Sequence, residues 1–299
     1  MLKGLAITPP VVGRISIGRV VERNGKRLPE KDDQFTLTSQ VQNRDGWVLH
    51  PLDETLKREA GGKLRSIPVR LLFNDPGLNL RADYSLFDRD TGRPVCVGNG
   101  ETCRRMGNEG IEAQACPGPE TCRFADGQCK AYARFNVVIG EGQEDTLGSF
   151  VLRTTSFNTI RTLAARLQYF SAVSGGRLAC MPLELKLRGK STAMSYRTAI
   201  YYVDLVVRAG NSLEQAIEEA RELDQRRQAS GFDQAALDKA ARQGFANGAF
   251  EELEEDVPAV VEEFHPEAAG DEAGDPLASK KQTSLGSKLE AKVARTANG

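Results

Sequence analysis

The chain has 299 residues, 40% of them hydrophobic and 27% charged, and its formal net charge at pH 7 is −1. This length is sufficient for a full hydrophobic core, either in one domain with a tail or in two domains. The N-terminal segment lacks the layout of a secretion signal, and no apolar run approaches a membrane span, so we expect a soluble cytoplasmic protein.

The charge is unevenly distributed along the chain. Residues 1–210 carry 30 Lys and Arg against 22 Asp and Glu, whereas residues 211–299 carry 10 against 19. The first part therefore has a net charge of +8 and the second a net charge of −9. A basic body joined to an acidic tail is typical of proteins that bind a polyanion such as DNA. An ordinary protein with uneven surface charge is the alternative interpretation.

The first 210 residues predict a β-rich α+β core domain, because apolar–polar alternations are separated by Gly, Pro and Asp turns. One amphipathic helix interrupts them, with Ser156 as its N-cap and Gly175 and Gly176 at its end. The expected strands are residues 12–21, 33–39, 66–74, 133–140, 148–155, 178–189 and 195–208.

From residue 211 the pattern becomes helical, and we expect a helical segment over residues 211–248 with helices at 212–228 and 232–245. Residues 249–299 are expected to form a disordered tail, acidic at first and then basic. Within it, residues 251–275 contain eleven acidic residues and no Lys or Arg. Such a composition cannot form a hydrophobic core of its own.

Cysteines are concentrated in an insert at about residues 94–131. Cys96 stands in PVCVGNG, and the stretch CPGPETCRFADGQC contains Cys116, Cys122 and Cys129. Its Pro and Gly residues make this stretch a poor helix or strand, so something other than a core must hold it. In a reducing compartment, clustered cysteines favour metal binding over disulfides. The sequence therefore predicts a zinc-knuckle insert with these four cysteines as ligands.

Zinc is the expected metal, and an iron–sulfur cluster or no metal at all are the alternatives. A site closed by four thiolates leaves no open position for water, and His50 and His265 lie far from the cluster in the sequence. We therefore expect the metal to be structural. Cys103 is a potential fifth contributor, and Cys180 is interpreted as a small core residue.

The order of VCVGNGETCRR, ACPGPETCRFADGQC, FVLRTTSFNTIRTLAARL and GGRLACMPLELKLRGKS resembles that of the phage recombination directionality factor-like proteins. The run GRISIGRVVERNGKRLPEKDDQFTLTS fits as well, so the resemblance covers roughly residues 10–208. Some relatives carry the label "hydrolase or metal-binding protein". The resemblance implies a phage or integrative element in a bacterial host cell, and a large serine integrase as the partner that is switched from integration to excision. It also implies a metal bound by Cys96, Cys116, Cys122 and Cys129.

A basic surface is expected around the start of the predicted helix. Free N–H groups at a helix N-terminus, with hydroxyls and Arg nearby, suit a phosphate oxygen, although a helix cap with solvated charges has the same pattern. Basic residues that alternate along the neighbouring strands form a stripe if they share one sheet face, and scattered surface charge if they do not. The expected DNA-binding residues are Arg153, Asn158, Arg161, Lys186, Arg188, Lys190 and Arg197.

Glu184-Leu185-Lys186 also matches the ExK part of a metal-dependent nuclease site. Such a site needs an acidic residue on the preceding strand, and residues 148–155 contain none. The sequence has no P-loop and no Ser/His/Asp or Cys/His catalytic set. We therefore expect no catalytic residues, with a metal-dependent nuclease or hydrolase as the alternative.

The expected function is that of a non-catalytic DNA-recombination accessory, which contacts DNA, a recombinase or both. A single-strand DNA-binding protein that recruits partners through its tail is a further alternative. The acidic segment either covers the basic face as a polyanion mimic, docks into the groove of a partner, or only adds solubility. Its expected partner-binding residues are Leu253, Val257, Val260 and Phe264.

Overall fold

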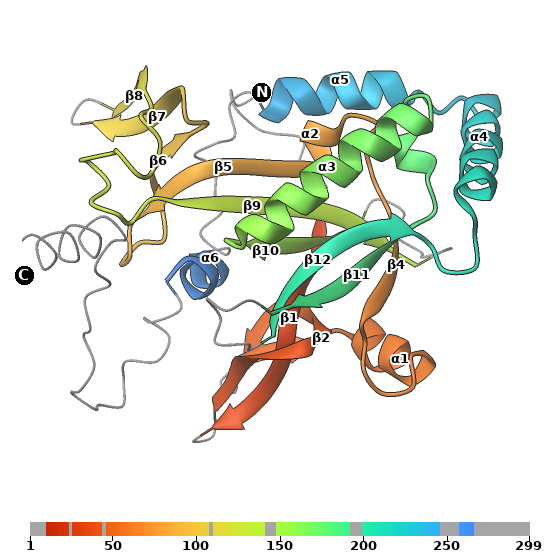
Figure 1. Ribbon diagram of the computed structural model, residues 1–299, viewed down its shortest axis with the longest axis horizontal. Coiled ribbons are helices and arrows are strands. Elements are labelled where there is room, and N and C mark those ends of the chain that lie inside the picture. The colour runs from red at the N-terminus through yellow and green to blue at the C-terminus, as the bar shows by residue number, and fades with distance from the viewer. Residues whose placement is uncertain are drawn as a thin grey trace, which may run out of the picture. The chain divides into compact units, whose positions relative to one another are not determined.

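The computed structural model describes residues 10–23, 26–43, 46–107, 110–140, 148–191, 199–245 and 257–265 (Figure 1). The chain divides into two units, 1–265 and 266–299, and every described residue lies in the first. The strands are β1 (Val11–Arg23), β2 (Lys26–Asn43), β3 (Gly46–Leu49), β4 (Ser66–Arg70), β5 (Leu80–Phe87), β6 (Pro94–Gly98), β7 (Thr102–Gly107), β8 (Gly110–Ala115), β9 (Lys130–Ile139), β10 (Ser149–Thr154), β11 (Leu183–Lys190) and β12 (Ile200–Val207). The helices are α1 (Pro51–Glu59), α2 (Pro76–Asn79), α3 (Phe157–Val173), α4 (Leu213–Ala229), α5 (Gln234–Phe245) and α6 (Val257–Phe264).

Strand β9 is the branching point of the sheet. Along one edge it pairs antiparallel with β10, and along the other its first half pairs with β5 while Val138 and Ile139 pair with β4. One branch continues through β5, β6, β7 and β8, and the other through β4, β11 and β12 (Figure 1). The N-terminal strands join β10 through the parallel pair of β1 and β10. The expected α+β fold class is confirmed.

Helix α3 contacts β12 in one branch and both β5 and β9 around the branching point. Ser156 caps it as predicted, because its hydroxyl accepts the Thr159 N–H at 3.4 Å. Leu163 and Leu167 are fully buried in the main core. Thr159 also accepts the N–H of Val203 at 3.2 Å, which covers the outer edge of β12.

Two of the predicted strands are partly replaced by turns. The segment 66–74 leaves the sheet after Arg70, because the chain turns there around the side chain of Asn79. The segment 178–189 begins with a 3-10 turn at Leu178–Cys180, and β11 starts only at Leu183. Cys180 is buried, as predicted, although in this turn and not at the start of a strand.

The buried Asn79 side chain makes four hydrogen bonds to the turn that it holds. Its Oδ1 accepts the N–H groups of Leu72 at 3.2 Å and Phe73 at 3.1 Å. Its Nδ2 donates to the carbonyl oxygens of Phe73 at 2.8 Å and Asp75 at 3.0 Å. Helix α5 docks on the same turn, since Asp238 of α5 accepts the N–H groups of Asn74 and Asp75. Asn79 therefore shapes the platform for α5.

Part of the expected disordered tail is helical. Residues 257–264 form α6, with Val260 and Phe264 fully buried against the body. The expectation of disorder from residue 249 onward is therefore wrong for this stretch. The reason is that Val260 and Phe264 are buried by the body of the chain, so this stretch needs no core of its own. Among the described helices, none is long and apolar enough to cross a membrane.

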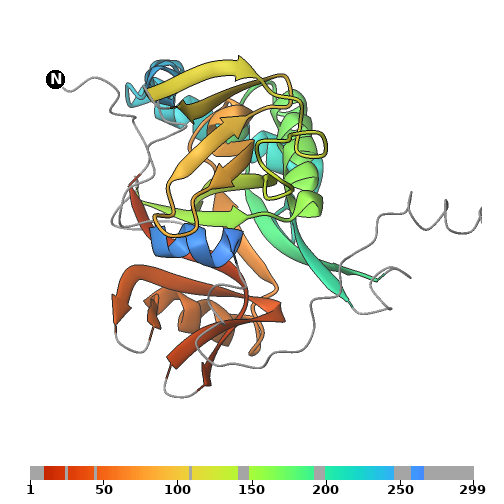
Figure 2. The same ribbon diagram turned by 90° about the vertical axis from the view of Figure 1, so that its left-hand side faces the viewer.

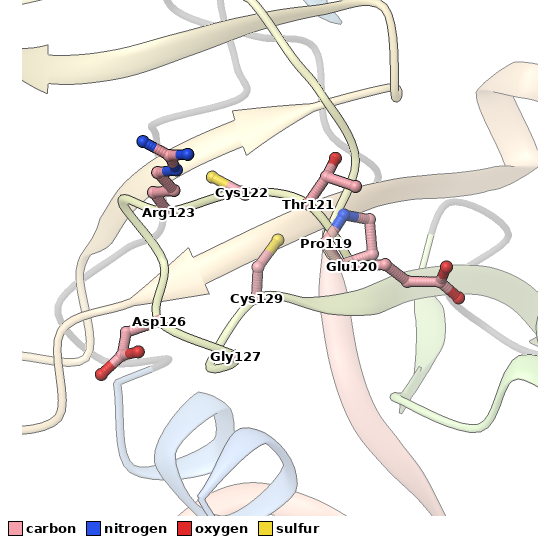
Figure 3. A pocket seen from close by; sticks show the side chains of 8 residues that line it. All are labelled: Pro119, Glu120, Thr121, Cys122, Arg123, Asp126, Gly127 and Cys129. Carbon is pink, nitrogen blue, oxygen red and sulfur yellow. The ribbon is translucent and has the colours of Figure 1, made fainter. Parts of the chain in front are cut away.

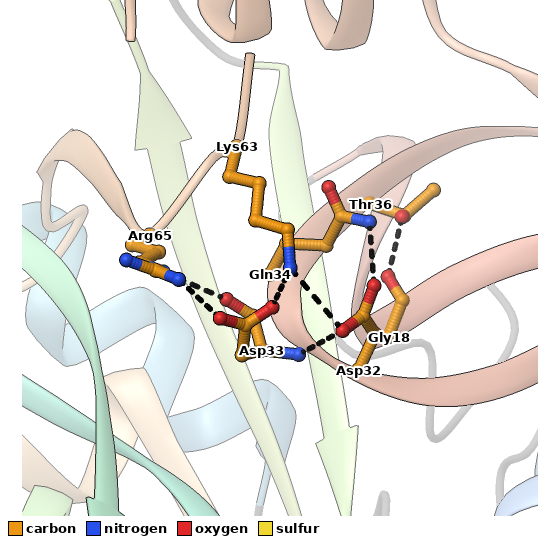
Figure 4. A network of polar contacts seen from close by, with 7 residues as sticks. All are labelled: Gly18, Asp32, Asp33, Gln34, Thr36, Lys63 and Arg65. Carbon is orange, nitrogen blue, oxygen red and sulfur yellow. Dashed lines mark hydrogen bonds and ion pairs between the residues drawn. The ribbon is translucent and has the colours of Figure 1, made fainter. Parts of the chain in front are cut away.

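A cluster of charges fastens the loop before β4 to strand β2 (Figure 4). Asp33 is paired with both Lys63 and Arg65, and Lys63 also lies 3.6 Å from Asp32. Between the two cations, the buried Leu64 accepts the N–H of Phe35 through its carbonyl oxygen at 2.7 Å. The hydrogen bonds from Lys63 and then Arg65 hold the pKa of the Asp33 carboxyl well below its usual range.

Replacing Asp33 by asparagine is expected to lower the free energy of unfolding slightly at neutral pH and not at all in strong acid. The folded-state pKa of Asp33 is depressed, so its stabilisation is complete above the unfolded-state value of about 3.9 and is lost as the pH falls through the folded-state pKa. The loss is small because exposed ion pairs contribute little. Urea unfolding of both proteins across the acid range measures it. A difference that persists at the lowest pH would assign the effect to neutral hydrogen bonds.

Candidate metal centre and neighbouring surfaces

Five cysteines come together at the far end of the β5 branch. Cys96 lies on β6 and Cys103 on the adjacent strand β7, where the register places them diagonally across the pair. Asn99 turns the chain between the two strands by accepting the N–H groups of Glu101 and Thr102. The two thiols are close enough for a hydrogen bond. Cys103 thus belongs to the cluster that the sequence assigned to four other cysteines.

The remaining three thiols arrive from the segment that follows β8. Cys116 comes directly after β8, Cys122 lies in the loop, and Cys129 directly precedes β9. With Leu86 and Ala125 these cysteines form a small hydrophobic cluster separate from the main core. The loop contains no helix or strand between Ala115 and Lys130, so the cluster is the main feature that holds it. All five cysteines are free thiols.

Desolvation and crowding make Cys103 and Cys129 difficult to ionise. Desolvation, followed by the hydrogen bond with Cys96, raises the pKa of Cys103 to about 11. Desolvation and then the nearby thiols of Cys96, Cys116, Cys122 and Cys103 raise the pKa of Cys129 to about 11. A bound cation would favour the thiolate forms of Cys103 and Cys129 and lower these pKa values.

Arg105 places a positive charge beside the cysteine cluster. Its Nη2 lies 3.9 Å from Cys122 Sγ, and its guanidinium stacks on the ring of Phe124, with Cζ 3.8 Å from the centroid. The pKa of Arg105 is raised by a hydrogen bond with Cys96 and by the charges of the cysteines, against an opposing effect of desolvation. Arg105, which pairs with Cys96 across β6 and β7, therefore extends across the cluster to Cys122 and Phe124 in the loop.

An open hollow of about 520 Å³ gives access to the cluster (Figure 3). Cys122 and Cys129 line it, together with the charged residues Glu120, Arg123 and Asp126. Among the described residues, no group of three or more His, Cys, Asp or Glu side chains is arranged to hold a metal ion. The donor set has the chemistry that zinc prefers, since it consists of clustered thiols on a Pro- and Gly-rich loop with a solvent path to it.

Among the described residues predicted to bind DNA, several are buried or paired within the chain. Arg153 is buried, Lys190 donates to Asn158 Oδ1 at 2.8 Å, and Arg197 lies outside the described residues. Arg161 is exposed on α3. The structure brings Asn158 and Lys190 together across the junction of α3 and β11.

The remaining basic residues of the stripe are next to acids of the chain itself. Arg188 donates to the buried Asp204 at 3.2 Å, and Arg166 donates to the same carboxylate at 2.9 Å. Lys186 lies 3.8 Å from Glu184. Glu184, the acid of the ExK segment, is buried and accepts the Ala209 N–H at 3.0 Å. These acids reduce the positive potential that a phosphate backbone would meet.

The four tail residues predicted to bind a partner have different positions. Val260 and Phe264 are buried against the body of the same chain. Leu253 lies outside the described residues, and Val257 begins α6. Thus Val260 and Phe264, two of the four predicted residues, contact the body of the same chain and not a partner protein.

Sequence reasoning left Cys103 out of the ligand set, and it missed the pair of Thr155 and Glu263. A signal for Cys103 was available, because Cys96 and Cys103 have the same six-residue separation as Cys122 and Cys129. The contact between Thr155 and Glu263 joins residues 108 positions apart and has no local signature.

Comparison with known proteins agrees with the order of these segments. A search of curated proteins and a search of solved structures found no match. The profile described as Gp3-like, recombination directionality factor-like, matches residues 12–208. The match includes the branching sheet, the cysteine cluster and α3. The chain therefore belongs to the recombination directionality factor-like family.

Proposed function

We propose that the chain is a non-catalytic accessory of DNA recombination in a phage or integrative element, and that it acts by direct contact with a recombinase. Family membership over residues 12–208 is the observation that carries this proposal. A protein partner is favoured over DNA because Arg188, Lys186 and Lys190 are each engaged with side chains of the chain itself.

Zinc bound by Cys96, Cys116, Cys122 and Cys129 would serve as a structural crosslink. Zinc prefers tetrahedral thiolate sets, and it supplies positive charge that stabilises ionised thiols. The cysteines would hold the loop of residues 116–129 against β6, while Arg105 shields the thiol charge from the strand side. Cys103 lies in the same cluster and would be a fifth thiol available to the metal.

The experiment combines the purified chain with the recombinase encoded beside its gene and with DNA carrying the excision sites. We expect excision product to increase when the chain is added, and the two proteins to co-elute without DNA. The Arg161→Glu variant is expected to behave like wild type, because exposed Arg161 would contribute mainly through phosphate contacts. A large loss with this variant, together with tight binding of DNA alone, would instead support a DNA-binding role.

The nuclease alternative is tested in the same mixtures. Labelled DNA incubated with the chain and Mg²⁺ or Mn²⁺ is expected to remain intact. Glu184 is the acid that such a site would require, and one of its oxygens already accepts the Ala209 N–H. Cleavage that disappears in the Glu184→Ala variant would establish an enzyme and overturn the accessory role.

A further inference from the structure

Helix α6 packs on the body of the chain through an aromatic and aliphatic cluster. Phe264 packs edge-on against Phe87, with ring centroids 4.9 Å apart, and lies 6.2 Å from the ring of Tyr132. Val260, one turn earlier, is fully buried in the same cluster. In Figure 2 the helix lies along the strands as a short separate rod. Among the described side chains of α6, the two that are fully buried, Val260 and Phe264, are thus one turn apart.

Polar contacts fix the direction of the helix on this surface. The Thr155 N–H donates to Glu263 Oε1 at 2.9 Å, and the Thr155 hydroxyl lies 3.4 Å from the same oxygen. Lys130 Nζ donates to the carbonyl oxygen of Phe264 at 3.0 Å, where a cation also complements the negative end of a helix. We call Phe87, Lys130, Tyr132 and Thr155 the α6-binding surface.

The body determines whether α6 is a helix at all. It has eight residues, whereas isolated helices shorter than about 12–15 residues are marginal in water. Its folding is therefore coupled to its docking, and a helix that makes the same contacts with a longer apolar face would compete with it. Because α6 is this short, a longer helix with the same contacts could displace it from the body.

We infer that the α6-binding surface is the docking site for an amphipathic helix of the recombinase, and that α6 is its competitor within the chain. The identity of the partner rests on the proposed function, whereas the surface itself rests on the contacts of α6. The contacts specify the partner: an apolar residue, a carboxylate three positions later and an aromatic residue one position after that, near the C-terminus of the helix. Val260, Glu263 and Phe264 define this pattern.

Charge complementarity supports this kind of occupant. The surface offers the Lys130 ammonium and the Thr155 N–H around an aromatic cluster, and it therefore suits a helix that ends in an acidic and aromatic pair. A basic helix would place like charge against Lys130. The same complementarity keeps α6 in place until a stronger competitor arrives.

The test uses a fluorescent synthetic peptide of residues 251–266 and two full-length proteins, wild type and Phe264→Ala. The variant loses the side chain that anchors α6, so we expect it to bind the peptide at least roughly tenfold more tightly than wild type, whose surface is already filled. Peptides carrying Phe264→Ala or Glu263→Gln should bind weakly. Hydrogen exchange at the Thr155 amide should be fast in the variant and slow again when the peptide is bound.

The recombinase is then added to the same proteins. It should bind the Phe264→Ala chain more tightly than wild type, and the unlabelled peptide should displace it. If the recombinase binds but the peptide does not compete, the inference is wrong and the proposed function stands. If the peptide binds and the recombinase does not, the recombinase is not the partner and the proposed function fails with it.

Two further measurements keep the result decisive. Thermal melting verifies that Phe264→Ala is folded, and the milder Val260→Ser variant replaces it if it is not. Light scattering measures whether wild type is a dimer. A dimer that the peptide converts to monomers would assign the surface to α6 of a second copy and overturn the recombinase assignment.

Discussion

Cys129→Ser is expected to abolish tight metal binding and to unfold the loop of residues 116–129. Cys129 interacts with all four other thiols of the cluster and directly precedes β9, so its loss removes both a proposed ligand and the anchor of the loop. The binding free energy of a structural zinc is folding free energy, about 10–16 kcal/mol in small zinc domains. In this larger chain we expect local unfolding of the insert, a loss of at least about 3 kcal/mol and a lower Tm.

Elemental analysis and thermal melting measure this effect. The wild type should contain about one zinc per chain, as expected for a single four-thiolate site, and chelation should reproduce the lower Tm of the variant. Cys180→Ser is the matched control, because Cys180 is buried outside the cluster and should leave the zinc content unchanged. Iron together with visible absorbance would identify an iron–sulfur cluster in place of the expected zinc. A metal-free wild type would contradict the proposed metal site.

Asn79→Ala is expected to cost about 3–5 kcal/mol, because it leaves several buried backbone groups without partners at about 1–3 kcal/mol each. Asn79 is fully buried and makes four hydrogen bonds to the turn that supports α5. At roughly 2–4 °C per kcal/mol for a chain of this size, Tm should fall by about 6–20 °C.

Urea unfolding of Asn79→Ala and of Asn211→Ala gives the comparison. Asn211 is half-buried and makes a single side-chain hydrogen bond to Glu219 at 3.3 Å, so its loss should cost less than about 1 kcal/mol. Similar losses in the two variants would show that water enters the turn and satisfies the exposed groups.

Local pattern predicted the elements that carry a strong signal of their own. The capped, amphipathic α3 begins one residue after Ser156 as expected, and β10 lies entirely within its predicted range. Strands β5 to β8 were missed, because they carry little apolar alternation and derive their pairing from one another. Five of the six residues of β8 are exposed, so the strand has no buried face to be marked by an alternation of large apolar and polar residues.

The surfaces were harder to predict than the elements. The sequence left open whether the basic residues of β11 share one sheet face, and the acid that Arg188 meets, Asp204, comes from the neighbouring strand. The sequence left three roles open for the acidic tail, namely covering a basic face, docking into a partner or adding solubility, whereas Phe264 contacts an aromatic pair formed by β5 and β9. Such contacts depend on three-dimensional pairing, which single-sequence periodicity does not contain.

The parallel pairing of β1 with β10 has a consequence for the order of folding on the ribosome. Val11 pairs with Ser149, so 137 residues must be synthesised between them before the pair can form. At about 5–20 residues per second, the edge of β1 that β10 will cover stays open for roughly 7–30 s. Such long-range pairing slows folding, and an open strand edge invites pairing with other nascent chains. Synthesis of this chain therefore includes a vulnerable interval that ends only when β10 emerges.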